Sequence, residues 1–287
     1  MPYARLIITA INRHWLQHAV QEVCGYGSSV IGCDAEAGFE KWIKSADTMD
    51  GRPGASVLMF AMSTDKLKKA VVNRVGQCLM TCPTTAVFDG FDEKSAIPVG
   101  APLRFFGDGF QKSKLIADRR FWRIPVMDGE FICEDKVGIA RGVAGGNFLI
   151  LSVDQISGLE AAERAVEKIK TLPGVITPFP GGVARSGSKV GSRYKSLVAS
   201  TSHAYCPTLK GRVESMLPAE ANCVYEIIID GTNFDSVGTA IKLGIEAALE
   251  QNERIVAISA GNYGGELGKL HFHLRKLLDL SHALPKK

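Results

Sequence analysis

Long apolar runs are missing from this chain. None of its 287 residues lies in an uninterrupted apolar stretch close to the roughly 20 residues that a helix needs to span a bilayer. The N-terminal apolar segment Leu6–Ala10 is also too short to be the core of a signal peptide. The sequence therefore predicts no membrane association, and we expect a cytoplasmic protein.

Strong charge and regularly spaced cysteines are missing as well. The formal net charge of +4 is too small and too scattered to favour nucleic acid as a partner. The seven cysteines are odd in number and irregular in spacing, which is typical of reduced thiols rather than of a disulfide framework. With 46% hydrophobic and 22% charged residues, the chain is predicted to be globular with a large core.

Common signatures of metal and nucleophile sites are incomplete. His14 and His18 have helical spacing for a metal but lack the Glu after the first His that a zincin needs, and His271 and His273 share one face of a predicted strand with no obvious third ligand. Cys206 is close to His203 in the sequence, yet nothing orients the two as nucleophile and base. We therefore predict no metal site and no covalent catalysis, with a metal at either histidine pair or a Cys–His pair as open alternatives.

Hydrophobic periodicity repeats one order of elements in both halves of the chain. In the first half, strands are predicted at Leu6–Ala10, Ser28–Gly32, Ala55–Met62 and Gln77–Thr81, and helices from about Asn12 and at Thr64–Arg74. In the second half, strands are predicted at Asn147–Val153, Gly174–Thr177, Cys223–Asp230 and Arg254–Ala260, and helices at Ser157–Lys170 and Phe234–Glu250. Each half thus has the ferredoxin-like split βαβ order. We predict an α+β fold of two such lobes, related by internal duplication.

The block from about residue 100 to 146 interrupts this order. Three of its segments alternate like strands: Leu103–Phe106, Phe121–Met127 and Glu130–Cys133. Asp128-Gly129 between two of them is typical of a hairpin turn. We predict an inserted antiparallel β meander here, an N-terminal lobe 1–146 that includes it, and a C-terminal lobe 147–287.

Two further features are predicted at the ends of elements in the second half. Ser157 and Glu160 stand at capping-box spacing, so the first helix of this lobe is expected to start at Ser157. A Gly-rich turn is expected at Gly261–Gly268, followed by an edge strand at Lys269–Leu274.

One predicted strand carries an acidic residue in its middle. Cys223–Asp230 reads C-V-Y-E-I-I-I-D, and Glu226 has apolar residues on both sides. Burial would remove hydration from this carboxyl group, raise its pKa and suit it to proton transfer near neutral pH. Alternatively, the side chain points into water or pairs with an arginine. The residues alone do not decide between these interpretations.

The loop Pro178–Lys210 is rich in Gly, Ser and basic residues. Four positive charges, Arg185, Lys189, Arg193 and Lys195, fall within it close together, and its glycines allow the backbone to approach a ligand. The loop is not a P-loop, because Ser188 stands where that motif requires Lys. We predict an anion site, with a solvated basic loop as the alternative.

Ten segments together resemble a known family. They are Gly51–Gly54, Arg74–Cys78, Phe105–Gly109, Gly129–Phe131, Ala144–Phe148, Pro178–Gly182, Ser186–Gly191, Tyr205–Thr208, Cys223–Glu226 and Ser259–Asn262. In order and spacing, from about Arg5 to Leu274, they resemble the formylmethanofuran–tetrahydromethanopterin N-formyltransferases. Cys82–Phe88 is similar to the version in methylotrophic bacteria, where the family supplies a subunit of a formyltransferase/hydrolase complex.

The resemblance implies an activity and a set of partners. Members of this family have two ferredoxin-like lobes and move a formyl group between the amine of a furan coenzyme, methanofuran or methylofuran, and N5 of tetrahydromethanopterin, in one-carbon metabolism. Both coenzymes are substrates, so no tightly bound cofactor is expected. The family also implies a homo-oligomer, dimer or tetramer, and other subunits of a formyltransferase/hydrolase complex as possible partners.

The resemblance also assigns roles to residues. The family's proposed catalytic glutamate falls on Glu226, as general acid/base for direct attack by an amine. Because these coenzymes carry carboxylates or phosphate, the basic loop is expected to bind them. The expected substrate-binding residues are Arg185, Ser188, Lys189, Arg193, Asn147, Ser200, Thr201 and Tyr205.

The sequence leaves two other functions open. The first is a catalytically silent scaffold subunit that binds coenzyme within such a complex. The second is a ferredoxin-like nucleic-acid binder, which requires surface aromatics among basic residues on a sheet. Tyr194, between Arg193 and Lys195, is the one candidate for such a residue in the sequence.

Overall fold

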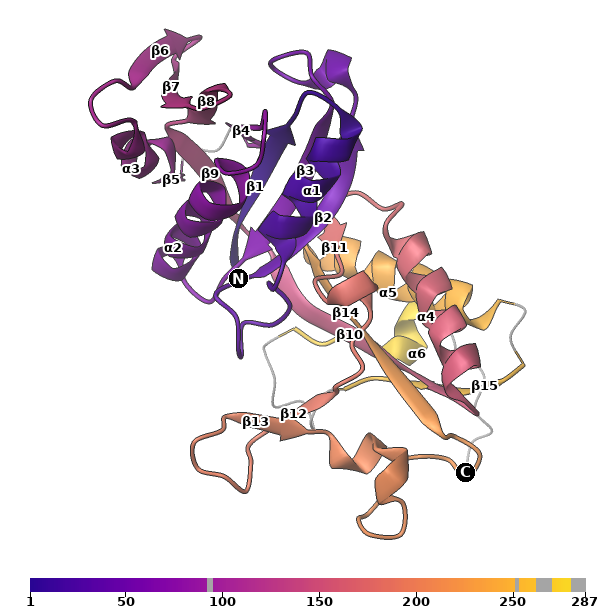
Figure 1. The fold of residues 1–287 in the computed structure, drawn as a ribbon. Helices are drawn as coiled ribbons and strands as arrows, with labels where there is room; N and C mark the ends of the chain where they lie inside the picture. Colours follow the sequence, from indigo (N-terminus) through magenta and orange to yellow (C-terminus); the bar gives the residue numbers. More distant parts are fainter. Residues whose placement is uncertain (92–94, 251–252, 262–269, 280–287) are drawn as a thin grey trace. The chain divides into compact units, whose positions relative to one another are not determined.

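The structure is a computed structural model that describes residues 1–91, 95–250, 253–261 and 270–279. The chain divides into two compact units, Met1–Gly142 and Val143–Lys287 (Figure 1). The domain boundary that the sequence predicts after residue 146 lies inside strand β10 (Val143–Ser152), four residues beyond the division of the structure.

Unit 1 contains a four-stranded antiparallel sheet with two helices on one face. Its elements are β1 (Pro2–Thr9), α1 (Arg13–Cys24), β2 (Glu36–Ile43), β3 (Gly54–Phe60), α2 (Thr64–Arg74) and β4 (Ala86–Asp89), with a 3-10 turn at Ser45–Asp47. The strand order is β2-β3-β1-β4, and all three pairings are antiparallel. This is the order of a ferredoxin-like split βαβ unit.

Local sequence explains the two helices of unit 1. The Asn12 side chain accepts a hydrogen bond from the Trp15 amide and so caps α1, and Ser63 caps α2 in the same way. Leu16 and Val20 are among the buried residues that α1 turns toward the sheet at helical spacing. The predicted range of α2, Thr64–Arg74, is confirmed.

Two strands predicted in unit 1 are wrong. The second strand is β2, and Ser28–Gly32 instead forms tight turns in which the amides of Gly32 and Cys33 donate to the Ser29 carbonyl. The predicted strand Gln77–Thr81 is instead largely occupied by a π-helical turn, Val75–Leu79, that continues α2. Such short apolar runs are ambiguous between helix and strand, and here burial of Val75 and Leu79 favours the helix.

The insertion widens the sheet of unit 1 rather than forming a separate layer. Its elements are β5 (Ala96–Pro98), α3 (Gly100–Leu103), a 3-10 turn (Arg104–Gly107), β6 (Lys112–Ile116), β7 (Arg119–Val126), β8 (Gly129–Glu134) and β9 (Lys136–Arg141). Strands β6, β7 and β8 form the expected antiparallel meander, with a two-residue turn before Gly129. Strand β8 then pairs with β4 in parallel, so the sheet has nine strands. The predicted strand Leu103–Phe106 is wrong, because these residues are helical.

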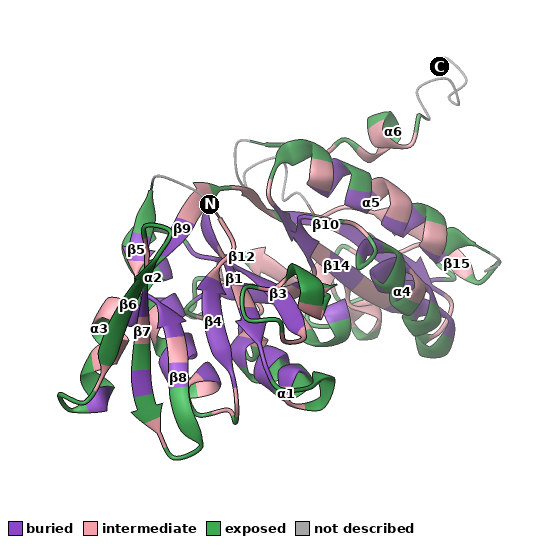
Figure 2. Ribbon diagram, turned by 90° about the horizontal axis from the view of Figure 1, so that it is seen from above, coloured by how far each residue is buried: buried purple, intermediate pink, exposed green. Residues whose placement is uncertain are grey.

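Figure 2 shows the distribution of burial in unit 1. Strands β1, β3 and β4 are buried along most of their length, whereas β6 is exposed throughout. Leu6, Val57 and Leu67 are among the fully buried residues of the core between sheet and helices.

Unit 2 repeats the topology of unit 1. Its elements are β10 (Val143–Ser152), α4 (Gln155–Ile169), β11 (Val175–Ile176), β12 (Ser188–Val190), β13 (Ala199–Thr201), β14 (Cys223–Gly231), α5 (Phe234–Leu249), β15 (Ile255–Ser259) and α6 (Leu274–Leu277), with 3-10 turns at Pro180–Gly182, His203–Tyr205 and Pro207–Leu209. The main sheet has the antiparallel order β11-β14-β10-β15. Counted along the chain, the second, third, first and fourth strands follow one another in both units.

Helices α4 and α5 lie next to each other on one face of this sheet (Figure 1). The core beneath them contains Phe148, Ile150, Ile227 and Ile229, which alternate along β10 and β14. Helix α4 does not begin at Ser157 as predicted. Its N-cap is Asp154, whose carboxylate accepts the Ser157 amide at 2.8 Å.

The end of unit 2 differs from the prediction. The strand expected at Arg254–Ala260 is confirmed as β15, with narrower bounds. Residues 270–273 are not in a strand and α6 begins at Leu274, so the predicted edge strand Lys269–Leu274 is wrong for the residues that the structure describes. The predicted Gly-rich turn, apart from Gly261, lies outside the described residues. Among those residues, every helix is too short or too polar to cross a bilayer.

The second face of the sheet in unit 2 is covered by the long excursion between β11 and β14. Leu149 and Leu151 of β10 pack there with Ala221, Tyr205 and Leu217 of the excursion. The face away from the helices is thus partly closed by the loop that the sequence singles out as basic, and the acidic residue of β14 lies on this same face.

Candidate active site

Glu226 is held in the centre of the sheet of unit 2. On β14 it pairs with Leu149 of β10 on one side. On its other side it forms a two-hydrogen-bond bridge with Ala184: the Ala184 amide donates to the Glu226 carbonyl at 2.8 Å, and the Ala184 carbonyl accepts from the Glu226 amide at 2.9 Å. Because side chains alternate along a strand, Ile227 faces the helices and Glu226 faces the excursion.

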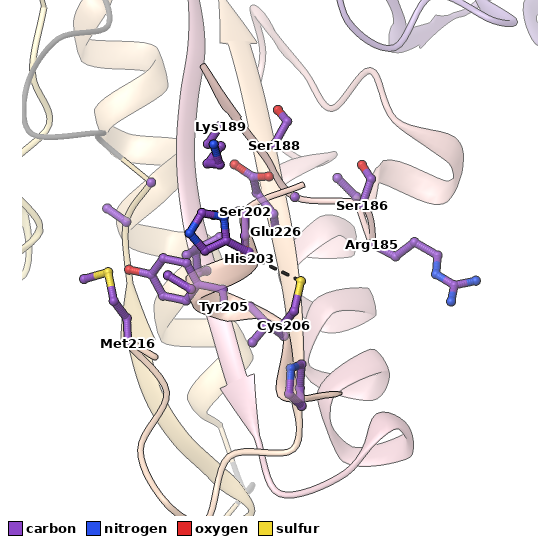
Figure 3. A pocket seen from close by; sticks show the side chains of 18 of the residues that line it. Arg185, Ser186, Ser188, Lys189, Ser202, His203, Tyr205, Cys206, Met216 and Glu226 are labelled. Carbon is purple, nitrogen blue, oxygen red and sulfur yellow. Dashed lines mark hydrogen bonds between the residues drawn. The ribbon is translucent and has the colours of Figure 1, made fainter. Parts of the chain in front are cut away.

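A pocket of about 480 Å³ lies over this carboxyl group (Figure 3). Its floor is formed by Leu149, Val224 and Glu226 of the sheet. The rest of its lining comes from Ala184–Lys189, Ser202–Thr208, Met216, Ala260 and Gly261. Pockets that combine apolar walls with a few polar groups are the usual form of small-molecule sites.

The Glu226 carboxyl is buried and has no charged partner among the residues that the structure describes. The residue is 7% exposed, and none of the hydrogen bonds or ion pairs among the described residues involves its side-chain oxygens. Desolvation alone raises its pKa from the ordinary glutamate value to about 7. The structure thus differs from the alternative in which Glu226 faces water or pairs with an arginine. In Figure 3 the guanidinium group of Arg185 extends away from Glu226.

The basic loop reaches the pocket through a short hairpin. Strands β12 and β13 pair Ser188 with Thr201 and Lys189 with Ser200. Gly187 and Gly191 adopt positive φ angles of 50° and 82°, which glycine tolerates best, and so allow the chain to turn at both ends of β12. This turn brings Ser188 and Lys189 to the pocket lining on the same side as Glu226.

The structure brings together only part of the predicted substrate-binding set. Arg185, Ser188, Lys189 and Tyr205 line the pocket together with Glu226. Tyr205 is oriented by a 3.4 Å hydrogen bond between its hydroxyl and that of Ser259.

The other four predicted residues are not among those that line this pocket. Arg193 and Thr201 are exposed, and the Ser200 hydroxyl donates to the Gly191 carbonyl at 2.7 Å inside the hairpin. The side-chain amide of Asn147 forms two hydrogen bonds with the backbone of Gly261. The charge or polarity of a residue does not reveal whether it faces a pocket or a neighbouring peptide.

Sequence reasoning missed several lining residues as parts of this site, namely Ser186, Ser202, His203, Cys206 and Met216. His203 and Cys206 were considered only as a nucleophile pair. The Cys206 thiol instead donates to the Ser202 carbonyl at 3.6 Å and lies 3.4 Å from the Thr201 hydroxyl. The adjacent segment Tyr205–Thr208, which carries the resemblance, was the signal that could have drawn attention to them.

Side chains that could bind a metal ion do not cluster in the part of the chain that the structure describes. Within the described ranges, no three His, Cys, Asp or Glu side chains come together in an arrangement that could hold a metal ion. His14 and His18 stack edge to face on α1 at 4.7 Å between ring centroids, and His271 and His273 lie outside any strand.

Two sequence models of known families together match most of the chain. The sequence model described as "Formylmethanofuran-tetrahydromethanopterin formyltransferase" matches residues 1–126. The model described as "FTR, proximal lobe" matches residues 129–277. The two matches correspond broadly to the two units of the structure.

Individual proteins are similar over nearly their full length. A formylmethanofuran–tetrahydromethanopterin formyltransferase of Methylococcus capsulatus is 52% identical over 97% of this chain and 94% of its own. A structure of the formyltransferase/hydrolase complex from Methylorubrum extorquens, in complex with methylofuran, contains a chain 46% identical with a TM-score of 0.93 over 96% of this chain and 92% of that one. The enzyme from Methanosarcina barkeri is 43% identical with a TM-score of 0.90, over 96% and 94%.

Proposed function

Because the chain belongs to the formylmethanofuran–tetrahydromethanopterin formyltransferase family and transfers a formyl group between methanofuran and tetrahydromethanopterin, we propose that Glu226 moves the proton in this transfer. One observation supports this role above the others. Glu226 is a buried carboxyl without a charged partner among the described residues, it lines the pocket, and its pKa is raised to about 7. A general base is most effective when its pKa lies near the working pH.

The reaction is an exchange of one amine for another on a formyl carbon. The nitrogen lone pair at N5 of tetrahydromethanopterin attacks this carbon, and the carbonyl π electrons move to oxygen. The Glu226 carboxylate takes the proton that the new N–C bond makes acidic. It then donates this proton to the furan coenzyme nitrogen as that C–N bond breaks, the carbonyl re-forms and the amine leaves. Glu226 begins and ends the cycle as a carboxylate in both directions.

The negative charge that develops on the formyl oxygen requires hydrogen-bond donors. The hydroxyl groups of Ser188 and Ser202 line the same pocket as Glu226 and are suited to this role, whereas Lys189 of the same lining is suited to bind an anionic group of a coenzyme. Arg185 extends away from Glu226 in Figure 3 and is better placed to contact an anionic part of a coenzyme at a distance from the formyl group. Tyr205 supplies an aromatic wall for a ring.

The Glu226→Gln variant tests the proposal because glutamine keeps the shape of the side chain and cannot accept the proton. We expect kcat to fall about 10²–10⁴-fold in both directions of the transfer, because this is the usual contribution of general acid–base catalysis to the rate. Spectrophotometric transfer assays measure kcat, and calorimetric titration with the formyl coenzyme should give a dissociation constant close to that of the unaltered enzyme. Turnover near the normal rate would rule out Glu226 as the proton carrier.

We also propose that methylofuran serves this chain as a furan coenzyme in place of or besides methanofuran, and that the chain functions in the cytoplasm, in a homo-oligomer or with other subunits of a formyltransferase/hydrolase complex. The similarity to the Methylorubrum extorquens complex with methylofuran supports the coenzyme class and the complex. Native mass spectrometry of the purified chain, followed by the transfer assay on the same sample, tests this. An active homo-oligomer would make other subunits dispensable for transfer, whereas activity only in a mixed complex would show that other subunits are required for it.

A further inference from the structure

Asn147 makes an unusual contact with the segment that follows β15. Its side-chain Oδ1 accepts a hydrogen bond from the Gly261 amide at 3.0 Å, and its Nδ2 donates to the Gly261 carbonyl at 3.1 Å. These are the hydrogen bonds that the Gly261 backbone makes with the described residues. The two residues are 114 positions apart, so the contact closes a long loop of the chain.

The strand register shows what this contact replaces. Strand β10 pairs with β15 at Leu149↔Ser259, Ile150↔Ile258 and Leu151↔Ala257. Continued by two residues, the same antiparallel register would pair Asn147 with Gly261. The backbone ladder stops at Ser259, and the Asn147 side-chain amide takes over both hydrogen bonds of the Gly261 peptide. The Gly261 peptide is therefore positioned by a side chain rather than by the sheet.

This peptide lies next to the proposed proton carrier. A Cβ built on Gly261 would lie 3.4 Å from Asn147 Nδ2 and 3.7 Å from Glu226 Oε1. Asn147 and Glu226 are on the same face of the sheet, because Asn147 pairs with Ile228, two residues beyond Glu226. Ala260 and Gly261 both belong to the pocket lining. The side of the carboxyl that faces β15 is thus covered by the peptide that Asn147 holds.

We propose that Asn147 is a positioning residue for catalysis, which fixes the Gly261 peptide over Glu226 and thereby keeps water from that side of the carboxyl group. This inference rests on the proposed role of Glu226. It assigns Asn147 a function different from the direct substrate contact expected from the sequence, because its amide binds the Gly261 backbone and Asn147 is not among the residues that line the pocket.

Other groups around the carboxyl do not account for the same effect. The titratable side chains that line the pocket with Glu226 are Arg185, Lys189, His203, Tyr205 and Cys206, and all of them come from the excursion. The sheet contributes only apolar neighbours, Leu149 and Val224, and the segment after β15 contributes Ala260 and Gly261. Asn147 is neutral, so its removal changes the hydration of Glu226 without changing the charge of the site.

The test is Asn147→Ala, with Asn222→Ala as the matched control. Asn222 is an exposed asparagine of the same unit, and its amide donates to the Glu220 carbonyl. Glutamate labelled with ¹³C at the carboxyl carbon reports the Glu226 titration by NMR, assigned by the signal that Glu226→Gln removes. In Asn147→Ala we expect the pKa of Glu226 to fall by about one unit as water reaches the carboxyl, and kcat to fall about tenfold. Asn222→Ala should leave both unchanged.

A double-mutant cycle separates positioning from a structural or binding role. In the Glu226→Gln background, Asn147→Ala should cause no further loss of kcat, because there is no carboxyl left to position. The proposal is overturned if Glu226 titrates at the same pH with and without Asn147, or if Asn147→Ala lowers kcat equally in both backgrounds. Near-normal turnover of Glu226→Gln alone would refute the proposed function instead, while the NMR titration would still decide whether Asn147 controls the hydration of Glu226.

Discussion

The two units share one topology, and each buries a glutamate on the face of its sheet away from the helices. In unit 1 the most deeply buried glutamate is Glu40, whose side chain is 2% exposed. It accepts two hydrogen bonds from Arg5, at 2.9 and 2.8 Å, and one from the Ser56 hydroxyl at 2.5 Å. In unit 2 this is Glu226, similarly buried, which has no hydrogen bond to its carboxyl among the described residues and faces a pocket.

The comparison shows that burial alone does not make a carboxyl reactive. A buried carboxylate that accepts hydrogen bonds from an arginine and a hydroxyl is balanced by those partners and holds strands together. A buried carboxyl without such partners holds its proton up to about pH 7 and can exchange it with a ligand. The difference between the units lies in the neighbours, Arg5 and Ser56 in one and a cavity in the other.

The largest expected effect concerns kcat, and it should occur in only one of the two units. Glu40→Gln is the matched control for Glu226→Gln, because both changes remove one buried charge at constant shape. We expect folded Glu40→Gln to retain a kcat of the normal order, whereas Glu226→Gln loses about 10²–10⁴-fold. Steady-state assays below the melting temperature of each variant measure this. Comparable losses in both would remove the functional distinction between the two acids.

Stability should change in opposite directions at alkaline pH. The pKa of Glu226 is about 7 in the folded protein and near 4.5 when unfolded. The folded state therefore binds the proton more tightly, and stability declines as pH rises through this window. Glutamine does not titrate, so the stability of Glu226→Gln should not decline in this way. The variant should be more stable than the unaltered protein by up to about 3 kcal/mol at pH 8 and by little at pH 4.5.

Glu40→Gln should instead be destabilised, by about 2–4 kcal/mol, because Arg5 is left without its buried counter-charge. Urea unfolding curves at the two pH values measure both variants. A Glu226→Gln variant that loses stability at pH 8 would show that this carboxyl has stabilising partners, as Glu40 does.

A smaller effect should distinguish the basic residues of unit 2. Lys189 lines the pocket, whereas Lys195 of the same loop is exposed and does not. Lys189→Ala should raise KM for a coenzyme about 3- to 10-fold through the loss of one charge-assisted contact. Lys195→Ala and Arg193→Ala should change KM much less. Equal increases in all three would indicate a diffuse electrostatic attraction by the loop rather than a contact in the pocket.

Most of the fold could be predicted from the sequence, because long periodic segments identify their own structure. Helix α2 and strand β14 were placed within one residue of their observed bounds. The errors occurred in short segments such as Ser28–Gly32 and Gln77–Thr81, where few side chains define a period and tertiary packing decides.

The candidate site could be predicted only in part from the sequence. Residue chemistry left Glu226 undecided between a solvated, a paired and a buried carboxyl, because that choice depends on Leu149 across the sheet and on the excursion above it. The family resemblance identified the residue as the candidate. The engagement of Asn147 with Gly261 depends on where a strand ladder ends, and no local pattern marks that position.

The dependence of kcat/KM on pH tests the central claim most directly, because it reports the ionisation of the free enzyme. Glu226 must start the cycle as a carboxylate, so kcat/KM should fall as pH decreases, with a midpoint of about 7. The residual activity of Glu226→Gln should lack this ionisation, and Glu40→Gln should keep it. A flat profile between about pH 5.5 and 8.5, or the same midpoint in Glu226→Gln, would contradict the assignment of Glu226 as the proton carrier.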